Sequence, residues 1–201
     1  MYHVFRKGIQ KTSNFLYHTN DAYWYRADLN DQEEIIFNNE DISVDFSDQD
    51  KTIRFIEEHG YYYPREMEIG LIEGHLFTSI KSKDKIIGYN KTGFKSVYID
   101  DFKRIYQFPL NVAFTYDTYI APEFRGHGYG LMLLYRVCSY LRNKRFKAMW
   151  GHIPPWNKAS EVMHRKLGFQ RYQMISYHSI AGLSWTSCNP VKLIQRVENE
   201  L

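Results

Sequence analysis

The clearest pattern of apolar and polar positions lies in the second half of the chain. Residues 112–120 form a continuous apolar and aromatic run, which predicts a buried strand. Residues 128–143 repeat apolar side chains at helical spacing, and a second apolar run at 146–153 ends at two prolines, which cannot donate to a strand ladder. A second helix is predicted over 157–167, followed by a strand over 169–179. This alternation predicts a mixed α/β layer fold.

The first half of the chain is less regular. A helix is predicted over residues 48–59, with Ser47 as its N-cap and Gly60 as its stop. An aromatic loop follows at 61–64, and the pattern of residues 68–98 predicts an antiparallel meander of strands.

The length and the even composition along the chain predict a single domain. The chain has 201 residues, no internal repeat and no linker-like segment. Within it we distinguish an N-terminal elaboration over 1–45 with strand-like aromatic segments, a helix and strand meander over 46–110, a core over 111–173, and a closing strand and tail over 174–201.

Aromatic residues are the unusual feature of the composition. They make up 17% of the chain, which provides rings for a large core and leaves some for a cleft. The net charge of +3 is small and dispersed, so we expect no nucleic-acid partner. Cys138 and Cys188 lack metal-ligand spacing and are interpreted as reduced thiols of a cytoplasmic protein. The sequence has neither a signal-peptide pattern nor an apolar run of about 18 residues, so no membrane partner is expected.

The segment that joins the strand at 112–120 to the helix at 128–143 carries the strongest chemical signal. It reads Pro122-Glu-Phe-Arg-Gly-His-Gly-Tyr-Gly130. Free backbone N–H groups and the positive end of the helix dipole meet at a helix N-terminus, and glycine lets the main chain approach an anion. The turn therefore suits a phosphate. It is neither a Walker A loop nor a dinucleotide fingerprint, because the residues that define those motifs do not follow.

This segment resembles the GCN5-related N-acetyltransferase (GNAT) superfamily. The run Arg125-Gly126-His127-Gly128-Tyr129-Gly130 matches that family's R/Q-x-x-G-x-G/A signature, and the resemblance extends from about Asn111 to Phe169. It implies an α/β (α+β mixed) fold with a central, mostly antiparallel twisted sheet, a V-shaped splay between two central strands, and helices on both faces. It also implies transfer of an acetyl group from acetyl-CoA to a primary amine by direct attack, without a metal.

The resemblance further implies which residues bind acetyl-CoA. The pantetheine arm would lie in the splay, where an open strand edge offers unpaired main-chain groups, and the pyrophosphate would lie on the glycine-rich turn. Asn157 would face the end of the pantetheine near the thioester. The predicted binding residues are Tyr119, Ile120, Arg125, Gly126, His127, Gly128, Tyr129, Gly130 and Asn157.

Direct attack requires a base for the amine, an N–H group for the oxyanion and an acid for the departing thiolate. The resemblance implies a main-chain N–H near Ile120 as the oxyanion donor. Many family members carry a Tyr acid at the position that His164 holds here, so His164 is either the acid or a packing residue. Asp117 is the candidate base, with anchoring of the amine and structural hydrogen bonding as alternatives.

The acceptor side of the site is predicted from aromatic and polar side chains. Tyr116, Trp150 and His152 are expected to bind the acceptor, and the rings at 15–25 and 61–63 are expected to shape its surroundings. The many rings and the lack of an acidic cluster in the sequence favour a small acceptor with an apolar or sugar-like face over a polycation.

Three classes of function stay open at this point. The leading one is acetylation of a small-molecule amine such as an amino acid or amino sugar. The others are a non-catalytic module that binds or senses acyl-CoA, and a transferase acting on a protein or an aminoacyl-tRNA. A homodimer is the candidate assembly.

Overall fold

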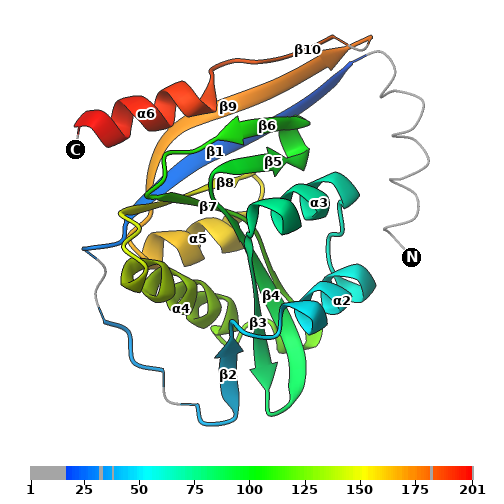
Figure 1. Cartoon of the computed structure of the whole chain (residues 1–201), viewed down its shortest axis with the longest axis vertical. Helices are drawn as coiled ribbons and strands as arrows, with labels where there is room; N and C mark the ends of the chain where they lie inside the picture. Colours follow the sequence, from blue (N-terminus) through cyan, green and yellow to red (C-terminus); the bar gives the residue numbers. More distant parts are fainter. Residues whose placement is uncertain (1–16, 32–33, 38, 182, 201) are drawn as a thin grey trace.

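A central sheet organises the protein in the computed structural model, which describes residues 17–31, 34–37, 39–181 and 183–200 (Figure 1). Its strands are β1 (His18–Asp28), β2 (Ile42–Asp45), β3 (Leu76–Ser82), β4 (Lys85–Gly93), β7 (Val112–Ile120), β8 (Ala148–Ile153), β9 (Gln170–Ile180) and β10 (Leu183–Thr186). They form an eight-stranded sheet in the order β10-β9-β1-β8-β7-β4-β3-β2. Neighbouring strands are antiparallel, apart from β7 and β8, which run parallel. The predicted mixed α/β fold with a mostly antiparallel sheet is confirmed.

Helices cover both faces of the sheet (Figure 1). On one face lie α4 (Tyr129–Asn143) and α5 (Lys158–Lys166). The other face is covered by α2 (Gln49–His59), α3 (Pro64–Glu73), α6 (Pro190–Glu200) and a hairpin of β5 (Ser96–Ile99) and β6 (Arg104–Gln107). Among the described residues, no helix combines the length and apolar character that a bilayer-spanning segment needs.

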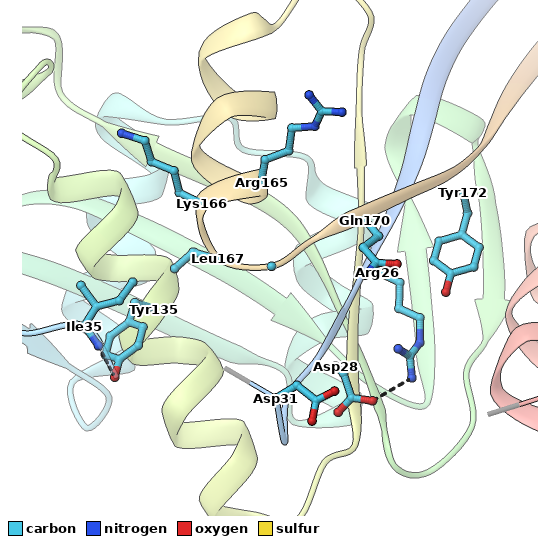
Figure 2. A pocket seen from close by; sticks show the side chains of 11 residues that line it. Arg26, Asp28, Asp31, Ile35, Tyr135, Arg165, Lys166, Leu167, Gln170 and Tyr172 are labelled. Atoms are coloured by element: carbon cyan, nitrogen blue, oxygen red, sulfur yellow. Dashed lines mark hydrogen bonds and ion pairs between the residues drawn. The ribbon is translucent and has the colours of Figure 1, made fainter. Parts of the chain in front are cut away.

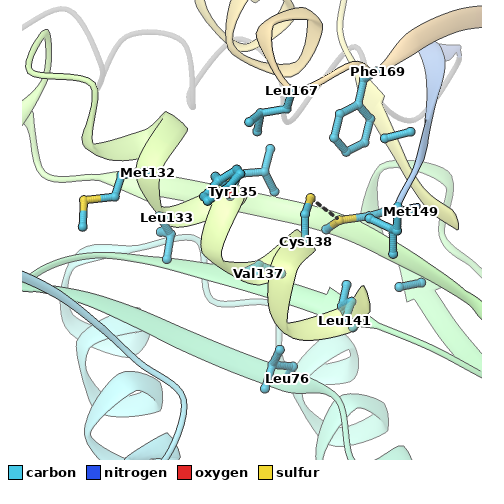
Figure 3. Packing of buried hydrophobic residues seen from close by; sticks show 14 of the residues in the cluster. Leu76, Met132, Leu133, Tyr135, Val137, Cys138, Leu141, Met149, Leu167 and Phe169 are labelled. Carbon is cyan, nitrogen blue, oxygen red and sulfur yellow. Dashed lines mark hydrogen bonds between the residues drawn. The ribbon is translucent and has the colours of Figure 1, made fainter. Parts of the chain in front are cut away.

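The helix α4 is anchored on the sheet by its apolar side (Figure 3). Leu133, Leu134, Val137, Cys138 and Leu141 are almost completely buried in one cluster with the strands beneath them. Burial of each large aliphatic side chain stabilises the fold by about 1.5–3 kcal/mol. This packing therefore fixes the position of the helix N-terminus and of the glycine-rich turn that precedes it.

The pairing between β7 and β8 stops halfway along the strands. It runs from Val112 opposite Ala148 to Thr115 opposite Gly151. Beyond this point β8 continues to pair with β1, and β7 continues to pair with β4 as far as Ile120. The two central strands therefore diverge, and the edge of β7 that faces β8 is not paired with it beyond Thr115.

A β-bulge lies at the point of divergence. Lys91 of β4 pairs with Asp117 and the next residue, Thr92, pairs with Thr115, so Tyr116 is the extra residue on β7. A bulge bends its strand and redirects the side chains beside it. Here it lies where Tyr116, a predicted acceptor-binding residue, and Asp117, the candidate base, occur.

Three local predictions for the first half of the chain need correction. The meander predicted from residue 68 is wrong over 68–73, which belong to α3; Pro64 begins this helix, and Gly74 ends it with a left-handed φ of 70°. The strand near 96–99 is present, but it pairs with β6 in a separate hairpin. The N-cap of α2 is Asp48, whose carboxylate accepts the N–H of Lys51, and not Ser47.

The two ends of the chain also differ from the sequence analysis. The segment 174–201, predicted as a closing strand and tail, contains α6, whose residues Leu193, Ile194 and Val197 are buried. The aromatic segment around Phe15 lies outside the described residues. The strand-like residues 22–26 form part of β1, which lies between β8 and β9 in the sheet.

Candidate active site

A cleft of about 830 Å³ opens where β7 and β8 diverge. Its walls come from the second half of β7, the turn before α4, the end of β8, the start of α5, and residues of α3 and β4. The predicted site residues on these walls are Tyr116, Asp117, Tyr119, Ile120, Arg125, Gly126, Gly128, Tyr129, Gly130, His152 and Asn157. The fold thus brings most of the residues chosen from the sequence into one space.

The turn before α4 has the conformation of an anion cradle. Gly126 and Gly128 have φ values of 85° and 78°, in the left-handed region that favours glycine. At either position, no described atom beyond the chain neighbours lies within 4 Å of where a Cβ would sit, so the main chain borders open space. The first turn of α4 holds no acidic side chain, which leaves the positive end of the helix dipole unneutralised. This geometry suits a phosphate.

Two neighbouring side chains stabilise this turn. The Nε of Arg125 donates to the carbonyl oxygen of Ile120 at 2.8 Å, and its guanidinium carbon lies 5.6 Å from the centre of the Tyr119 ring. The ring of His127 stacks on Tyr129 at 5.5 Å, and His127 is not part of the cleft wall. The turn is therefore held to the end of β7 by its own arginine.

The start of α5 forms the opposite side of the cleft. The Asn157 side chain caps this helix, because its Oδ1 accepts the N–H of Ser160 at 3.1 Å. Met163, one turn further along, has its sulfur 3.1 Å from the ideal Cβ position at Gly130. The two helices thus approach each other at the glycine-rich turn.

A buried lysine lies deeper in the cleft. Lys91 is fully buried, and its Nζ lies 2.6 Å from Glu66 and 3.3 Å from Asp117. The same nitrogen donates to the carbonyl oxygen of Tyr61 at 2.9 Å. The contacts with Glu66 and Tyr61 are hydrogen bonds, and the contact with Asp117 is an ion pair, so the buried ammonium is surrounded by acceptors and negative charge. Sequence analysis did not identify Glu66 or Lys91; the signal was a lysine in the middle of an otherwise buried strand, which requires a charged partner.

The two carboxylates around Lys91 have different surroundings. Burial raises the pKa of Glu66 to about 7, although Lys91 beside it acts in the opposite direction. The hydroxyl of Tyr89 donates to Asp117 Oδ2 at 2.6 Å and accepts the N–H of Tyr61 at 2.9 Å. Burial, followed by the charge of Asp117, raises the pKa of Tyr89, so this phenol remains a donor. Asp117 is thus held by a hydrogen bond from Tyr89 and an ion pair with Lys91, and Glu66 is held by a hydrogen bond from Lys91.

A second acidic group, Asp101, contacts the end of β8 through His152. The Nε2 of His152 is 2.7 Å from Asp101 Oδ2, and the amide of Asn20 donates to the other oxygen of Asp101 at 2.9 Å. Burial alone would raise the pKa of Asp101, but hydrogen bonds from His152 and Asn20 lower it below its ordinary value. Asp100 and Asp101 both line the cleft. Neither was identified from the sequence, because they lie in a short 3₁₀ segment far from β8 along the chain.

Two predicted site residues are buried behind the cleft walls. Trp150 is fully buried in the core under α6, and its Nε1 donates to Glu198 at 2.8 Å. His164 is 5% exposed, and its Nδ1 lies 2.8 Å from the carbonyl oxygen of Ser160. Burial lowers the pKa of His164 to about 4. Neither residue is part of the cleft wall, whereas Ser160 is.

A second hollow of about 520 Å³ lies near the C-terminal end of α5 (Figure 2). In that view Arg165 and Lys166 lie on its upper side, and Asp28 and Asp31 lie on its lower side. Its described lining includes no residue of β7 or of the turn before α4, so it does not contain the phosphate cradle. Within the described residues, no group of three or more His, Cys, Asp or Glu side chains is arranged to hold a metal ion.

Comparisons with known proteins agree with this geometry. The sequence model described as the acetyltransferase (GNAT) family matches residues 39–169. A GCN5-related N-acetyltransferase from Sphaerobacter thermophilus shares the fold with a TM-score of 0.60 and 13% identity, over 89% of this chain and 57% of that one. A tandem GNAT protein from the clavulanic acid biosynthesis pathway has a TM-score of 0.60 and 14% identity, over 90% of this chain and 59% of that one.

These structural likenesses show the fold, and the chain spans 57% and 59% of the lengths of the two proteins just named. A search of curated proteins found no match. The family match covers well over half of the sequence and includes the glycine-rich turn, β7, α4 and β8. The chain therefore belongs to the acetyltransferase (GNAT) family.

Proposed function

We propose that the protein is an N-acetyltransferase that moves an acetyl group from acetyl-CoA to a primary amine of a small-molecule acceptor. The observation that carries this proposal is a single cleft that joins a phosphate cradle at the start of α4 to carboxylates on α3 and β7. Membership of the family supports acyl transfer in general, and acetyl-CoA and the amine acceptor are the parts proposed here.

The residues of the turn fit the donor. The open main chain at Gly126 and Gly128 and the free end of α4 would hold the pyrophosphate, and the edge of β7 near Tyr119 would pair with the amides of the pantetheine. Asn157 would lie beside the thioester end. When bound, acetyl-CoA supplies an acetyl group activated as a thioester.

The chain's own contribution is to deprotonate and orient the acceptor. Asp117 was the base predicted from the sequence, and it already accepts from Tyr89 and lies beside Lys91. Glu66 has a pKa of about 7, raised by burial, and a general base works best when its pKa lies near the working pH. We therefore assign the base to Glu66 and the fixing of the amine to Asp117. The N–H near Ile120 is the proposed oxyanion donor.

His164 was predicted to be either the acid that protonates the thiolate or a packing residue. Its connection to the cleft runs through Ser160, whose carbonyl and hydroxyl oxygens lie 2.8 Å and 3.3 Å from Nδ1. A histidine with a pKa of about 4 is neutral at neutral pH and holds no extra proton to give. We propose that His164 positions Ser160 and the start of α5.

The proposal is tested by titration calorimetry with acetyl-CoA, followed by a thiol-release assay with a panel of amines. We expect acetyl-CoA to bind and free thiol to appear with at least one class of primary amine. Binding without thiol release for any amine would identify a non-catalytic acyl-CoA-binding module. A failure to bind acetyl-CoA would refute the donor site itself.

A further inference from the structure

The two ends of the cleft differ in charge. Arg125 lines the end at the glycine-rich turn, near the N-terminus of α4, and Lys166 at the end of α5 is another basic residue of the cleft wall. The other end is lined by the carboxylates of Glu66, Asp100, Asp101 and Asp117. These four carboxylates come from α3, from the segment after β5 and from β7, so the fold assembles an acidic cluster that is dispersed in the sequence. This corrects the expectation that the protein lacks one.

The four carboxylates act on a common region of the cleft. Tyr63, on the same wall, has its pKa raised first by burial and then by the charges of Asp101, Asp100, Glu66 and Asp117. Tyr63 and the four carboxylates all line this one cleft. An acceptor in that space would meet negative charge on several sides.

The cation inside this cluster is not available to an acceptor. Lys91 is fully buried; its Nζ donates hydrogen bonds to Glu66 and to the carbonyl oxygen of Tyr61, and it forms an ion pair with Asp117 at 3.3 Å. It is one positive charge between two carboxylates. An acceptor that carries a carboxylate or phosphate would therefore face acidic groups without a free cation on this wall.

The walls near the cluster also carry groups that accept cations. Lys91 Nζ lies 5.6 Å and 5.5 Å from the ring centres of Tyr63 and Tyr116, within the range of cation–π contact. The His152 side chain is only 4% exposed, and its Nε2 is paired with Asp101. Its Nδ1 has no hydrogen-bond partner in the described part of the chain. Both rings already face the Lys91 ammonium, and the His152 Nδ1 is buried, so the groups left on this wall for a cation are the carboxylate oxygens.

We propose that the acceptor is a dication: a linear diamine or polyamine whose second ammonium group is held by Asp101 while the first reacts beside Glu66. Asp100 lies next to Asp101 and is already paired with Lys103 at 2.6 Å. This inference rests on the proposed function. The reacting amine must lose its proton before it attacks, so it no longer neutralises the carboxylates around it. A second ammonium group that stays charged would neutralise these carboxylates throughout the reaction. The Asp101 side chain is 45% exposed and therefore accessible for this contact.

A matched series of amines tests the inference. Cadaverine, n-pentylamine and δ-aminovalerate have the same five-carbon chain and differ in the group at the far end: an ammonium, a methyl and a carboxylate. We expect kcat/KM with acetyl-CoA to be at least tenfold higher for cadaverine than for n-pentylamine, and lowest for δ-aminovalerate. The preference should shrink as NaCl is raised, because ions screen charge pairs.

A variant pair places the preference in the structure. Asp101→Asn should bring the ratio of the cadaverine and pentylamine kcat/KM values toward one. Asp84→Asn is the matched control, since Asp84 is an exposed carboxylate in the β3–β4 turn outside the cleft, and it should leave the ratio unchanged.

Failure of this inference can be distinguished from failure of the proposed function. Thiol release with n-pentylamine equal to or above that with cadaverine would overturn the dication and leave acetyl transfer intact. If acetyl-CoA binds and no amine releases thiol, the proposed function fails. Calorimetry of the same three compounds on the CoA-bound protein then decides the acceptor inference: equal affinity for cadaverine and n-pentylamine would overturn it, and tighter binding of cadaverine would support it.

Discussion

The buried imidazole of His164 makes the stability of the protein depend on pH in a way that can be calculated. Burial lowers its folded-state pKa from 6.5 to about 4. Its Nδ1 lies against the carbonyl oxygen of Ser160, and its edge packs on Phe169 with ring centres 4.8 Å apart. The neutral ring fits this place, and an imidazolium would be an uncompensated buried charge.

The sign follows from the two pKa values. Above pH 6.5 the histidine is neutral in both the folded and the unfolded state, so it adds no pH dependence. Below pH 6.5 the unfolded state takes up a proton that the folded state does not, which favours unfolding until the pH falls through about 4. At about 1.4 kcal/mol per pKa unit, the loss of free energy of unfolding is about 2 kcal/mol by pH 5 and about 3 kcal/mol by pH 4.

The measurement is urea unfolding of the wild type and of His164→Gln between pH 7 and pH 4.5. A constant offset between the two proteins reports lost packing, and the pH-dependent part of the difference reports the histidine. The two proteins must be compared because Glu66, with a pKa raised to about 7, makes the folded state of both proteins more stable on acidification over the same range. Subtracting one curve from the other removes this shared contribution. We expect the two curves to converge by about 2 kcal/mol as the pH falls from 7 to 5.

Parallel curves, with a difference that stays constant from pH 7 to 5, would refute the reasoning. Titration of the imidazole Cε1 proton by NMR gives an independent check, because a midpoint near 6.5 would mean that the ring is not held neutral by burial. In the same range, His164→Gln should leave the position of the acidic limb of the activity profile where it is in the wild type. A loss of that limb would restore the histidine as a proton donor or acceptor in the reaction.

Three further predictions concern the cleft and the closing helix. Gly128→Val should weaken acetyl-CoA binding at least a hundredfold by calorimetry. Gly74→Val is the control, because Gly74 is also a left-handed glycine with open space around it: both variants should lose about 1–2 kcal/mol of stability, but Gly74→Val should keep the affinity for acetyl-CoA. Glu66→Gln should remove an acidic limb with an apparent pKa near 7 from kcat/KM, since the base must be deprotonated and the rate rises with pH. Glu198→Ala should lower the free energy of unfolding by about 3–5 kcal/mol in urea, because it leaves the buried Arg26 guanidinium without its 2.7 Å partner; a loss below about 1 kcal/mol would contradict this.

The parts of the fold that could be predicted are those whose signals lie next to one another in the chain. The strand β7 occupies 112–120 as predicted, because a long apolar run bounded by a proline leaves few alternatives. The glycine-rich turn and the cap at Asn157 were also identified, since a helix start depends on a few adjacent residues. The donor half of the cleft is built from such local features.

The helix α3 shows where this kind of reasoning fails. Its residues 69–72 are a short apolar run, and such runs do not distinguish a strand from a helix by periodicity alone. Pro64 in the first turn and Gly74 just past the end were the signals that favoured a helix. Because that helix carries Glu66, the wrong assignment also concealed the residue now proposed as the base.

The acidic end of the cleft depends on contacts between residues that are far apart in the sequence. Glu66 and Lys91 are 25 residues apart, and His152 and Asp101 are 51 apart. Neither pair has a local pattern that links its members. A lysine in the middle of a buried strand predicts that some carboxylate must lie nearby, but only the packing of α3 against the sheet determines which one.

Trp150 and His152 show most clearly that the sequence does not reveal where two neighbouring strands separate. They lie two residues apart on β8 and therefore point to the same face of the sheet, so both were predicted to bind the acceptor. Pairing with β7 continues to Gly151, which keeps Trp150 in the closed part of the sheet under α6, while His152 lies just past the divergence and reaches the cleft. The residue at which two parallel strands separate thus decides which side chain meets the acceptor. That residue is set by the bulge at Tyr116 and by the pairing of β8 with β1, both of which are properties of the folded sheet.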